Sequence, residues 1–147
     1  MTLPLREMLN LLMPPSVFYR RRIAHEIRSG EPELAMLASL VQRGGTAIDV
    51  GANQGLFAFA LSEIVGRVVA FEPNPDYAFF SRWMLRGHAE VKSFALSDQA
   101  GHATFTVPVS DEGMDLHFAG SLKPSHAQFA KFKSYDVEVH QIGRAHV

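Results

Sequence analysis

Residues 46–72 read TAIDVGANQGLFAFALSEIVGRVVAFE, and this stretch decides the fold class. Residues 46–50 have the apolar character of a short strand, and the glycines within residues 51–55 predict a tight turn. Apolar residues at helical spacing predict a helix over residues 56–65. Residues 67–71 are apolar almost without interruption, which is typical of a strand buried on both faces. Strand, helix and strand in this order predict two parallel strands joined by a right-handed crossover.

The segment after residue 72 adds a second helix and a third strand to this unit. Asn74 is a favourable N-cap and Pro75 a favourable first helical residue. The helix that they begin has an apolar side that we expect to pack in the core, and this side comprises Phe79, Phe80, Trp83 and Met84. Residues 91–96 are the candidate third strand. The sequence therefore predicts an α/β protein built on a parallel βαβαβ unit.

The flanks of this unit have weaker patterns. Residues 1–30 predict a helical lead-in, with one helix over Leu3–Leu12 and a second over Val17–Arg28, whose basic run Arg20-Arg21-Arg22 we interpret as a solvated helix face. Pro32 is expected to begin a further helix that ends at Gly44-Gly45. On the other side, residues 102–109 and 135–140 alternate polar and apolar side chains and predict two half-exposed, antiparallel strands.

Composition excludes several classes of protein. The chain has 147 residues, of which 47% are hydrophobic and 20% charged, as in an ordinary globular domain. A formal net charge of −1 gives no electrostatic reason to expect a nucleic-acid or membrane partner. No cysteine is present, which rules out disulfide scaffolds and thiol catalysis, and the seven histidines lack metal-like spacing, so we expect no metal site. We expect a cytoplasmic protein, because no secretory signal or membrane span is evident.

Two acidic residues flank the glycine turn and indicate a ligand site. Asp49 lies two residues before Gly51, and Glu72 ends the next strand, 21 residues after Gly51. Glycines at a strand-to-helix turn allow the backbone to approach a ligand closely. The spacing places the Glu72 carboxylate at the tip of the neighbouring strand, where it can accept both hydrogen bonds from a ribose diol.

The turn favours S-adenosylmethionine over a dinucleotide. The glycine pattern is G-x-x-x-G, and not the G-x-G-x-x-G of dinucleotide sites. A dinucleotide would place its anionic pyrophosphate close to Asp49, which would repel it, whereas S-adenosylmethionine brings a sulfonium and an α-ammonium group. A P-loop is excluded, since no Gly-Lys-Ser/Thr follows the turn. We therefore predict S-adenosyl-L-methionine as the cofactor.

Three segments in order resemble the FkbM family of S-adenosylmethionine-dependent methyltransferases. They are AIDVGANQGLFAFALS (residues 47–62), VVAFEPNP (68–75) and SFALSDQAGHATFTVP (93–108). The resemblance covers about residues 31–140 and implies a Rossmann-like class I methyltransferase fold. It also implies O-methylation of a hydroxyl group on a sugar or small natural-product acceptor.

The resemblance also assigns residues to the cofactor site, position by position. It implies that Asp49, Gly51, Asn53 and Gly55 surround the methionine part of the cofactor. Glu72 would hold the ribose hydroxyls and Pro73 would border the adenine. From the other side, the adenine would be contacted by Ala95, Leu96 and Ser97. No catalytic residue is named, because the acceptor-side groups of this fold generally come from later strands.

The last residues, 142–147, do not fit the family pattern. They match a translated sequencing-adapter sequence, and the Leu-Asp-Asp-like segment and acidic D-x-E-G motif expected after residue 140 are missing. We therefore expect residues 1–30 to be the lead-in, residues 31–141 a partial methyltransferase domain and residues 142–147 a non-native tail. A chain cut short in this way is expected to be inactive alone.

Three alternatives stay open at this point. An RNA or protein methyltransferase would share the cofactor half, although the near-neutral charge argues against RNA. A non-catalytic domain that binds an adenosyl ligand would also fit. NAD binding is the third alternative and is disfavoured by Asp49. The acceptor and the oligomeric state are not specified by the sequence.

Overall fold

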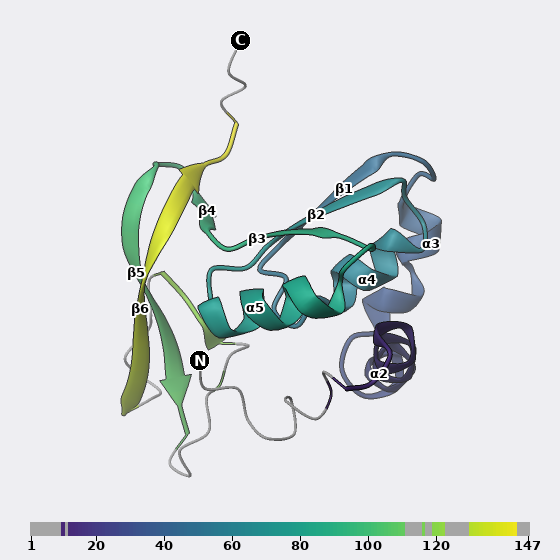
Figure 1. The fold of residues 1–147 in the computed structure, drawn as a ribbon, viewed down its shortest axis with the longest axis horizontal. Helices are drawn as coiled ribbons and strands as arrows, with labels where there is room; N and C mark the ends of the chain where they lie inside the picture. The colour runs from purple at the N-terminus through teal and green to yellow at the C-terminus, as the bar shows by residue number, and fades with distance from the viewer. Residues whose placement is uncertain (1–9, 11, 111–115, 117–118, 123–129, 144–147) are drawn as a thin grey trace.

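The first sheet has three parallel strands, β1 (Thr46–Val50), β2 (Arg67–Phe71) and β3 (Glu90–Lys92), in the order β1-β2-β3. It belongs to a computed structural model that describes residues 10, 12–110, 116, 119–122 and 130–143. Helix α4 (Leu56–Ser62) connects β1 to β2, and α5 (Pro75–Met84) connects β2 to β3. Both helices lie on the same face of the sheet (Figure 1). The predicted parallel βαβαβ unit is confirmed.

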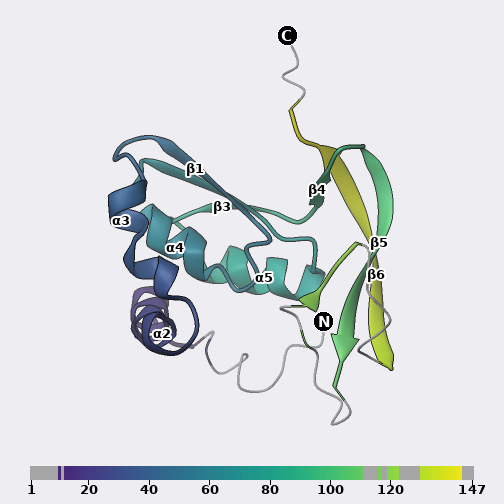
Figure 2. The ribbon, with the colours of Figure 1, turned by 180° about the vertical axis from the view of Figure 1, so that it is seen from behind.

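The main core lies between this sheet and its helices. Strand β2 turns Val68 and Ala70 toward the helices, where both are buried. The opposite face of the sheet differs from the prediction, because Val69 and Phe71 of β2 are only partly buried there. On the neighbouring β1, Ile48 and Val50 are 64% and 58% exposed. Within the part of the chain that the structure describes, no helix covers that face (Figure 2).

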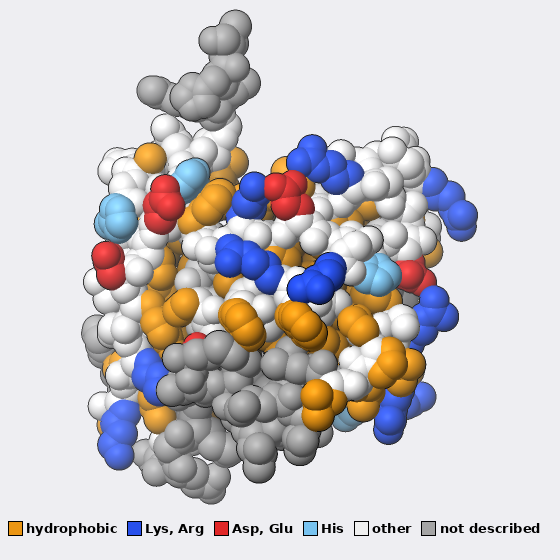
Figure 3. Space-filling model, viewed as in Figure 1, with side chains coloured by type: hydrophobic (Ala, Val, Ile, Leu, Met, Phe, Trp, Pro, Cys, Tyr) orange, Lys and Arg blue, Asp and Glu red, His pale blue; other side chains and the backbone are white. Residues whose placement is uncertain are grey.

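Helix α5 begins as its sequence predicts. The Asn74 side chain accepts a hydrogen bond from the backbone N–H of Asp76 at 3.1 Å, and Pro75 is the first helical residue. Phe80 and Met84 are fully buried, but Phe79 and Trp83 are each 45% exposed, so the expectation that they pack in the core is wrong. Residues 80 and 84 lie one turn apart on the core stripe, and residues 79 and 83 are rotated away from it. Hydrophobic side chains are visible over α5 in Figure 3.

The third strand predicted over residues 91–96 is correct at its start but wrong in its extent, because this segment forms two strands in two sheets. Strand β3 ends at Lys92, and β4 (Ala95–Ser97) pairs in parallel with β6 (Lys131–Gln141). Between them, the Phe94 ring lies 5.3 Å from that of Phe71 and stacks on His140 at 3.8 Å. These contacts lie where the chain leaves the first sheet. No local sequence pattern predicts this change of sheet.

The second sheet has the order β4-β6-β5, and β5 (Gly101–Val109) runs antiparallel to β6. The predicted antiparallel pair is thereby confirmed. A small core lies on this sheet and consists of Ala95, Phe105, Val107, Val137 and Val139. The Tyr135 hydroxyl donates to the Asp76 carboxylate at 3.5 Å and joins this sheet to the start of α5.

The N-terminal segment forms α2 (Pro15–Ser29), in agreement with the helix predicted over Val17–Arg28. The helix predicted over Leu3–Leu12 lies almost entirely outside the described residues. The single helix predicted from Pro32 is wrong: a 3₁₀ turn, η1 (Pro32–Ala35), is followed by the short α3 (Leu37–Leu40). Leu34, within η1, is buried. None of the described helices has the length and apolar character needed to cross a membrane.

Candidate functional site

The glycine turn after β1 folds back over the end of β2. The backbone N–H groups of Gly51 and Ala52 both donate to the carbonyl oxygen of Phe71, at 2.9 and 3.0 Å. Gly51 has φ +79°, and a Cβ placed there would meet no atom within 4 Å. The turn therefore presents open backbone next to Asp49, and a ligand can approach it closely.

Glu72 ties this turn to the turn before α5. One carboxylate oxygen accepts from the backbone N–H of Asn53 at 2.6 Å, and the other accepts from that of Asn74 at 2.8 Å. Asn53 has a left-handed backbone (φ 52°), and its carbonyl accepts from the Ser81 hydroxyl at 2.6 Å. Burial raises the pKa of Glu72, the two backbone hydrogen bonds oppose this shift, and the charge of Asp49 adds to it. Glu72 thus fixes the shape of the turn.

Asp49 is the acid of the site whose pKa is raised strongly. Burial raises its pKa to about 6; a hydrogen bond from the Ala58 backbone opposes the shift, and the Glu31 carboxylate adds to it. Its Oδ2 atom is buried and has no hydrogen-bond partner among the described residues. A buried acceptor without a donor is costly, and such a group marks a place where a ligand can supply the donor.

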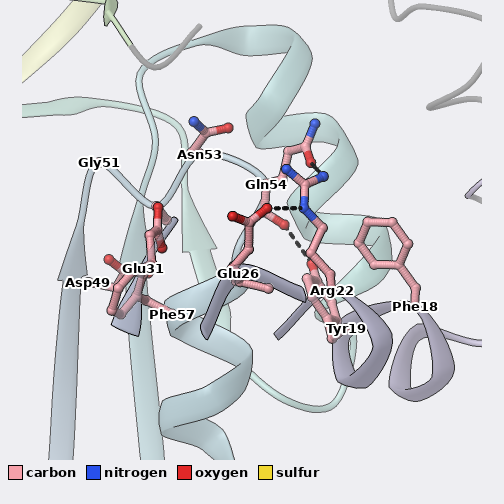
Figure 4. A pocket seen from close by; sticks show the side chains of 12 residues that line it. Phe18, Tyr19, Arg22, Glu26, Glu31, Asp49, Gly51, Asn53, Gln54 and Phe57 are labelled. Atoms are coloured by element: carbon pink, nitrogen blue, oxygen red, sulfur yellow. Dashed lines mark hydrogen bonds and ion pairs between the residues drawn. The ribbon is translucent and has the colours of Figure 1, made fainter. Parts of the chain in front are cut away.

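A cavity of about 400 Å³ lies between α2, the segment before η1 and the glycine turn (Figure 4). Of the residues predicted for the cofactor site, Asp49, Gly51 and Asn53 line it. The remaining lining comes from α2, from the residue before η1, from the glycine turn itself and from the start of α4, and comprises Phe18, Tyr19, Arg22, Glu26, Glu31, Ala52, Gln54, Leu56 and Phe57.

The structure places the other predicted site residues outside this lining. A Cβ on Gly55 would come within 2.6 Å of the Leu85 side chain, so this glycine serves packing. Glu72 is buried behind the turn, and Pro73 follows it at the start of the turn before α5. Residues 95–97 form β4 in the second sheet, where Ala95 is buried and Ser97 donates to Asp98.

The sequence patterns did not predict that α2 and Glu31 contribute to the cavity. Tyr19 is fully buried, stacks on Phe59 at 4.7 Å and donates its hydroxyl to the Gln54 carbonyl at 2.7 Å. Arg22 belongs to the basic run interpreted as solvated, yet it lines the cavity, whereas Arg20 pairs with Glu63 on the surface. No local signal identifies these residues, because their contacts join positions more than 30 apart in the sequence.

Tyr19→Phe is expected to lower the free energy of unfolding by about 1 kcal/mol, because the part-buried Gln54 carbonyl in the turn loses its hydroxyl donor while the ring packing stays. Burial raises the pKa of the Tyr19 phenol, so the hydroxyl keeps its proton and donates throughout the working pH range. Chemical denaturation followed by circular dichroism measures this change. A variant as stable as the wild type would contradict the assigned role of the hydroxyl.

Metal ligation has no support in the described residues. Among them, no group of three or more His, Cys, Asp or Glu side chains is placed to hold a metal ion. Two histidines pair with single carboxylates on the second sheet, His102 with Asp136 and His140 with Glu138. The expectation that the protein needs no metal remains a prediction.

The parallel unit, the glycine turn at the carboxyl end of β1 and the acid at the end of β2 define a Rossmann-like α/β protein with a cavity at the turn. Residues 49–144 match the model of one family, the methyltransferase FkbM domain. The match covers more than half of the sequence, and the chain belongs to this family. The family predicted from the sequence motifs is thereby confirmed.

Solved structures give more distant likenesses. A Streptococcus mutans protein assigned as a methyltransferase and solved with SAH is 19% identical at TM-score 0.40, over 44% of this chain and 39% of that one. An rRNA methylase from Streptococcus thermophilus is 15% identical at TM-score 0.38, over 42% and 37%. A TehB-like SAM-dependent methyltransferase from Corynebacterium glutamicum is 20% identical at TM-score 0.39, over 52% and 43%. The chain thus spans about two fifths of the length of these proteins. No curated protein matches the sequence.

Proposed function

We propose that the protein is an S-adenosyl-L-methionine-dependent methyltransferase whose cofactor binds at the glycine turn. The observation that supports this most directly is the buried, unpaired Oδ2 of Asp49 beside the open backbone of Gly51. The unpaired carboxylate oxygen suits a cationic ligand, and the open backbone leaves space for that ligand beside the turn. Membership of the FkbM methyltransferase family supports the same proposal.

Each predicted cofactor residue has a role in this proposal. Asp49, Gly51 and Asn53 line the cavity and would surround the methionine part, while Gly55 allows the turn to pack against Tyr19 of α2 and Leu85 at the end of α5. Glu72 would hold the ribose hydroxyls. Its two hydrogen bonds to backbone N–H groups use two of the roughly four acceptor positions of a carboxylate, so acceptor positions are left for the diol.

The adenine would lie beyond Glu72, on the side of the second sheet. Pro73 follows Glu72 directly and would border the base. Residues 95–97, in β4, would contact it from the other side, where Leu96 and Ser97 are half-buried. A bound cofactor would therefore extend from the cavity at Asp49 across the end of β2 toward the second sheet.

For methyl transfer, the main task of the cofactor site is to align the methyl group with the acceptor, and acid–base chemistry at this site is secondary. The bound cofactor supplies an electrophilic methyl group, and the enzyme holds it in line with the acceptor oxygen. We propose a hydroxyl on a sugar or small natural-product scaffold as the acceptor, as the family resemblance implies. An acceptor hydroxyl also needs a group that takes its proton. A non-catalytic adenosyl-binding domain and an RNA or protein methyltransferase are the alternatives.

Titration calorimetry with three ligands tests the proposal. S-adenosylhomocysteine and S-adenosylmethionine are expected to bind the wild-type chain, and NAD is not, because its pyrophosphate would face Asp49. Incubation with labelled S-adenosylmethionine and hydroxylated acceptors would then separate an enzyme from a binding domain. Tight binding of NAD without binding of either adenosyl ligand would reject the proposal.

Glu72→Ala is expected to weaken the binding of both adenosyl ligands by about 1–3 kcal/mol, because charge-assisted hydrogen bonds to the ribose and the support of the Asn53 turn are lost together. Glu90→Ala is the matched control, since Glu90 lies on the surface of β3 and pairs with Arg67 and Lys92. Calorimetry on the two variants gives the comparison. Unchanged affinity in the Glu72 variant would remove Glu72 from the site.

A further inference from the structure

We propose that Glu31 is a second carboxylate of the cofactor site and that, together with Asp49, it receives the α-ammonium group of the bound ligand. This inference rests on the proposed function and extends it to a residue outside the family motifs. Glu31 lies between α2 and η1, 18 positions before Asp49 in the sequence, and both residues line the same cavity (Figure 4).

The two carboxylates share an unusual state. Glu31 Oε2 and Asp49 Oδ2 are the buried side-chain oxygen atoms that lack a hydrogen-bond partner among the described residues. A buried acceptor without a donor destabilises the folded state, and a native structure keeps such groups where a ligand, ion or water completes them. Two such atoms on one cavity, contributed by separate segments, indicate that the missing donor binds there.

The side chains that line this cavity carry more negative than positive charge. Three carboxylates line it, those of Glu26, Glu31 and Asp49, against one guanidinium, that of Arg22. Arg22 already contacts Glu26 at 3.4 Å through Nε and donates to the Gln54 side chain at 2.5 Å through Nη1. Burial and the neighbouring carboxylates of Glu26 and Glu33 raise the pKa of Glu31, and Arg22 opposes this only in part. A cationic ligand would offset the repulsion between the acids.

The chemistry of the two oxygen atoms selects the ammonium end of the ligand. An ammonium group has three N–H donors and can serve both carboxylates at once. A sulfonium carries positive charge but no N–H, so it cannot satisfy either acceptor. The open space beside Gly51, next to Asp49, would admit the amino-acid chain that carries the ammonium. The inference therefore concerns recognition of the amino-acid part and leaves the adenosine part to Glu72 and β4.

Glu31→Gln tests this inference, with Glu33→Gln as the control. Glu33 is exposed, lies two positions along the same segment and does not line the cavity. The ligands are S-adenosylhomocysteine, which carries the ammonium, and 5′-methylthioadenosine, which lacks the amino-acid part. In calorimetry at pH 7, Glu31→Gln is expected to bind S-adenosylhomocysteine about 10- to 100-fold more weakly and 5′-methylthioadenosine as well as the wild type does. Glu33→Gln is expected to bind both ligands normally.

The other outcomes separate the two proposals. If the wild type binds S-adenosylhomocysteine and Glu31→Gln binds it equally well, the role of Glu31 is wrong and the proposed function stands. If Glu31→Gln loses both ligands to the same extent, Glu31 acts on the fold and the inference is again wrong. If the wild type binds neither ligand, the proposed function fails with it. Saturable binding of Mg²⁺ alone that depends on Glu31 would identify the missing cation as a metal and overturn the inference.

Discussion

Asp49→Asn is expected to stabilise the unliganded protein at pH 7 and, at the same time, to weaken its binding of S-adenosylhomocysteine. In the folded state the pKa of Asp49 is raised from 3.8 to about 6, mainly by burial. The folded protein therefore holds this proton more tightly than the unfolded chain does. Above pH 6 the buried charge destabilises the fold by about 1–3 kcal/mol. The neutral amide of asparagine avoids this cost but loses the charge that attracts a cationic ligand.

The sign of the pH dependence makes this prediction specific. The destabilisation by Asp49 is fully present above pH 6 and disappears as the pH falls through the window from 6 to below 4. The difference in free energy of unfolding between Asp49→Asn and the wild type should shrink over the same window. Asp98→Asn is the control, because Asp98 is exposed in a turn and an amide oxygen can still accept the Ser97 hydroxyl. A variant that is less stable at pH 7 and binds normally would contradict the role of Asp49.

Gly55→Ala is expected to lower the free energy of unfolding by about 2–4 kcal/mol, through a left-handed backbone that alanine disfavours and through overpacking of the core. Gly55 has φ +82°, and an added Cβ would lie 2.6 Å from Leu85 Cδ1 and 3.0 Å from the Tyr19 hydroxyl. Leu85 and Tyr19 are both fully buried, so neither can move aside without disturbing the core. Thermal melting and urea denaturation measure this loss.

Gly51→Ala is the informative counterpart, because the same chemical change has a different result at the other end of the turn. Gly51 also has a left-handed backbone (φ +79°), but no atom lies within 4 Å of an added Cβ. Gly51→Ala is therefore expected to lower the free energy of unfolding by only about 1–2 kcal/mol, through backbone strain. The new methyl group would occupy ligand space, so the affinity for S-adenosylhomocysteine should fall. Equal destabilisation by the two substitutions would contradict the separation of packing and ligand roles within the turn.

Several features of this protein follow from local sequence patterns, and these predictions are confirmed. The strand, glycine turn, helix and strand over residues 46–71 form as predicted, because alternation, helical spacing and glycine each act over a few neighbouring residues. The Asn74 cap and the start of α5 at Pro75 also follow from local sequence and are confirmed. Asp49 and Glu72 could be identified as site candidates because parallel strands bring their carboxyl ends to one edge of the sheet.

Other features depend on contacts between distant segments and have no local signature. Strand β4 leaves the first sheet to pair with β6, more than 40 positions away. Tyr19 and Glu31 reach the glycine turn only because α2 packs against α4. The exposure of Phe79 and Trp83 likewise depends on which stripe of α5 meets the sheet. Short-range preferences of the chain thus specify the helices, the strands and the glycine motif. The partners of the buried polar groups and the full lining of the cavity arise from packing between elements that are far apart in the sequence.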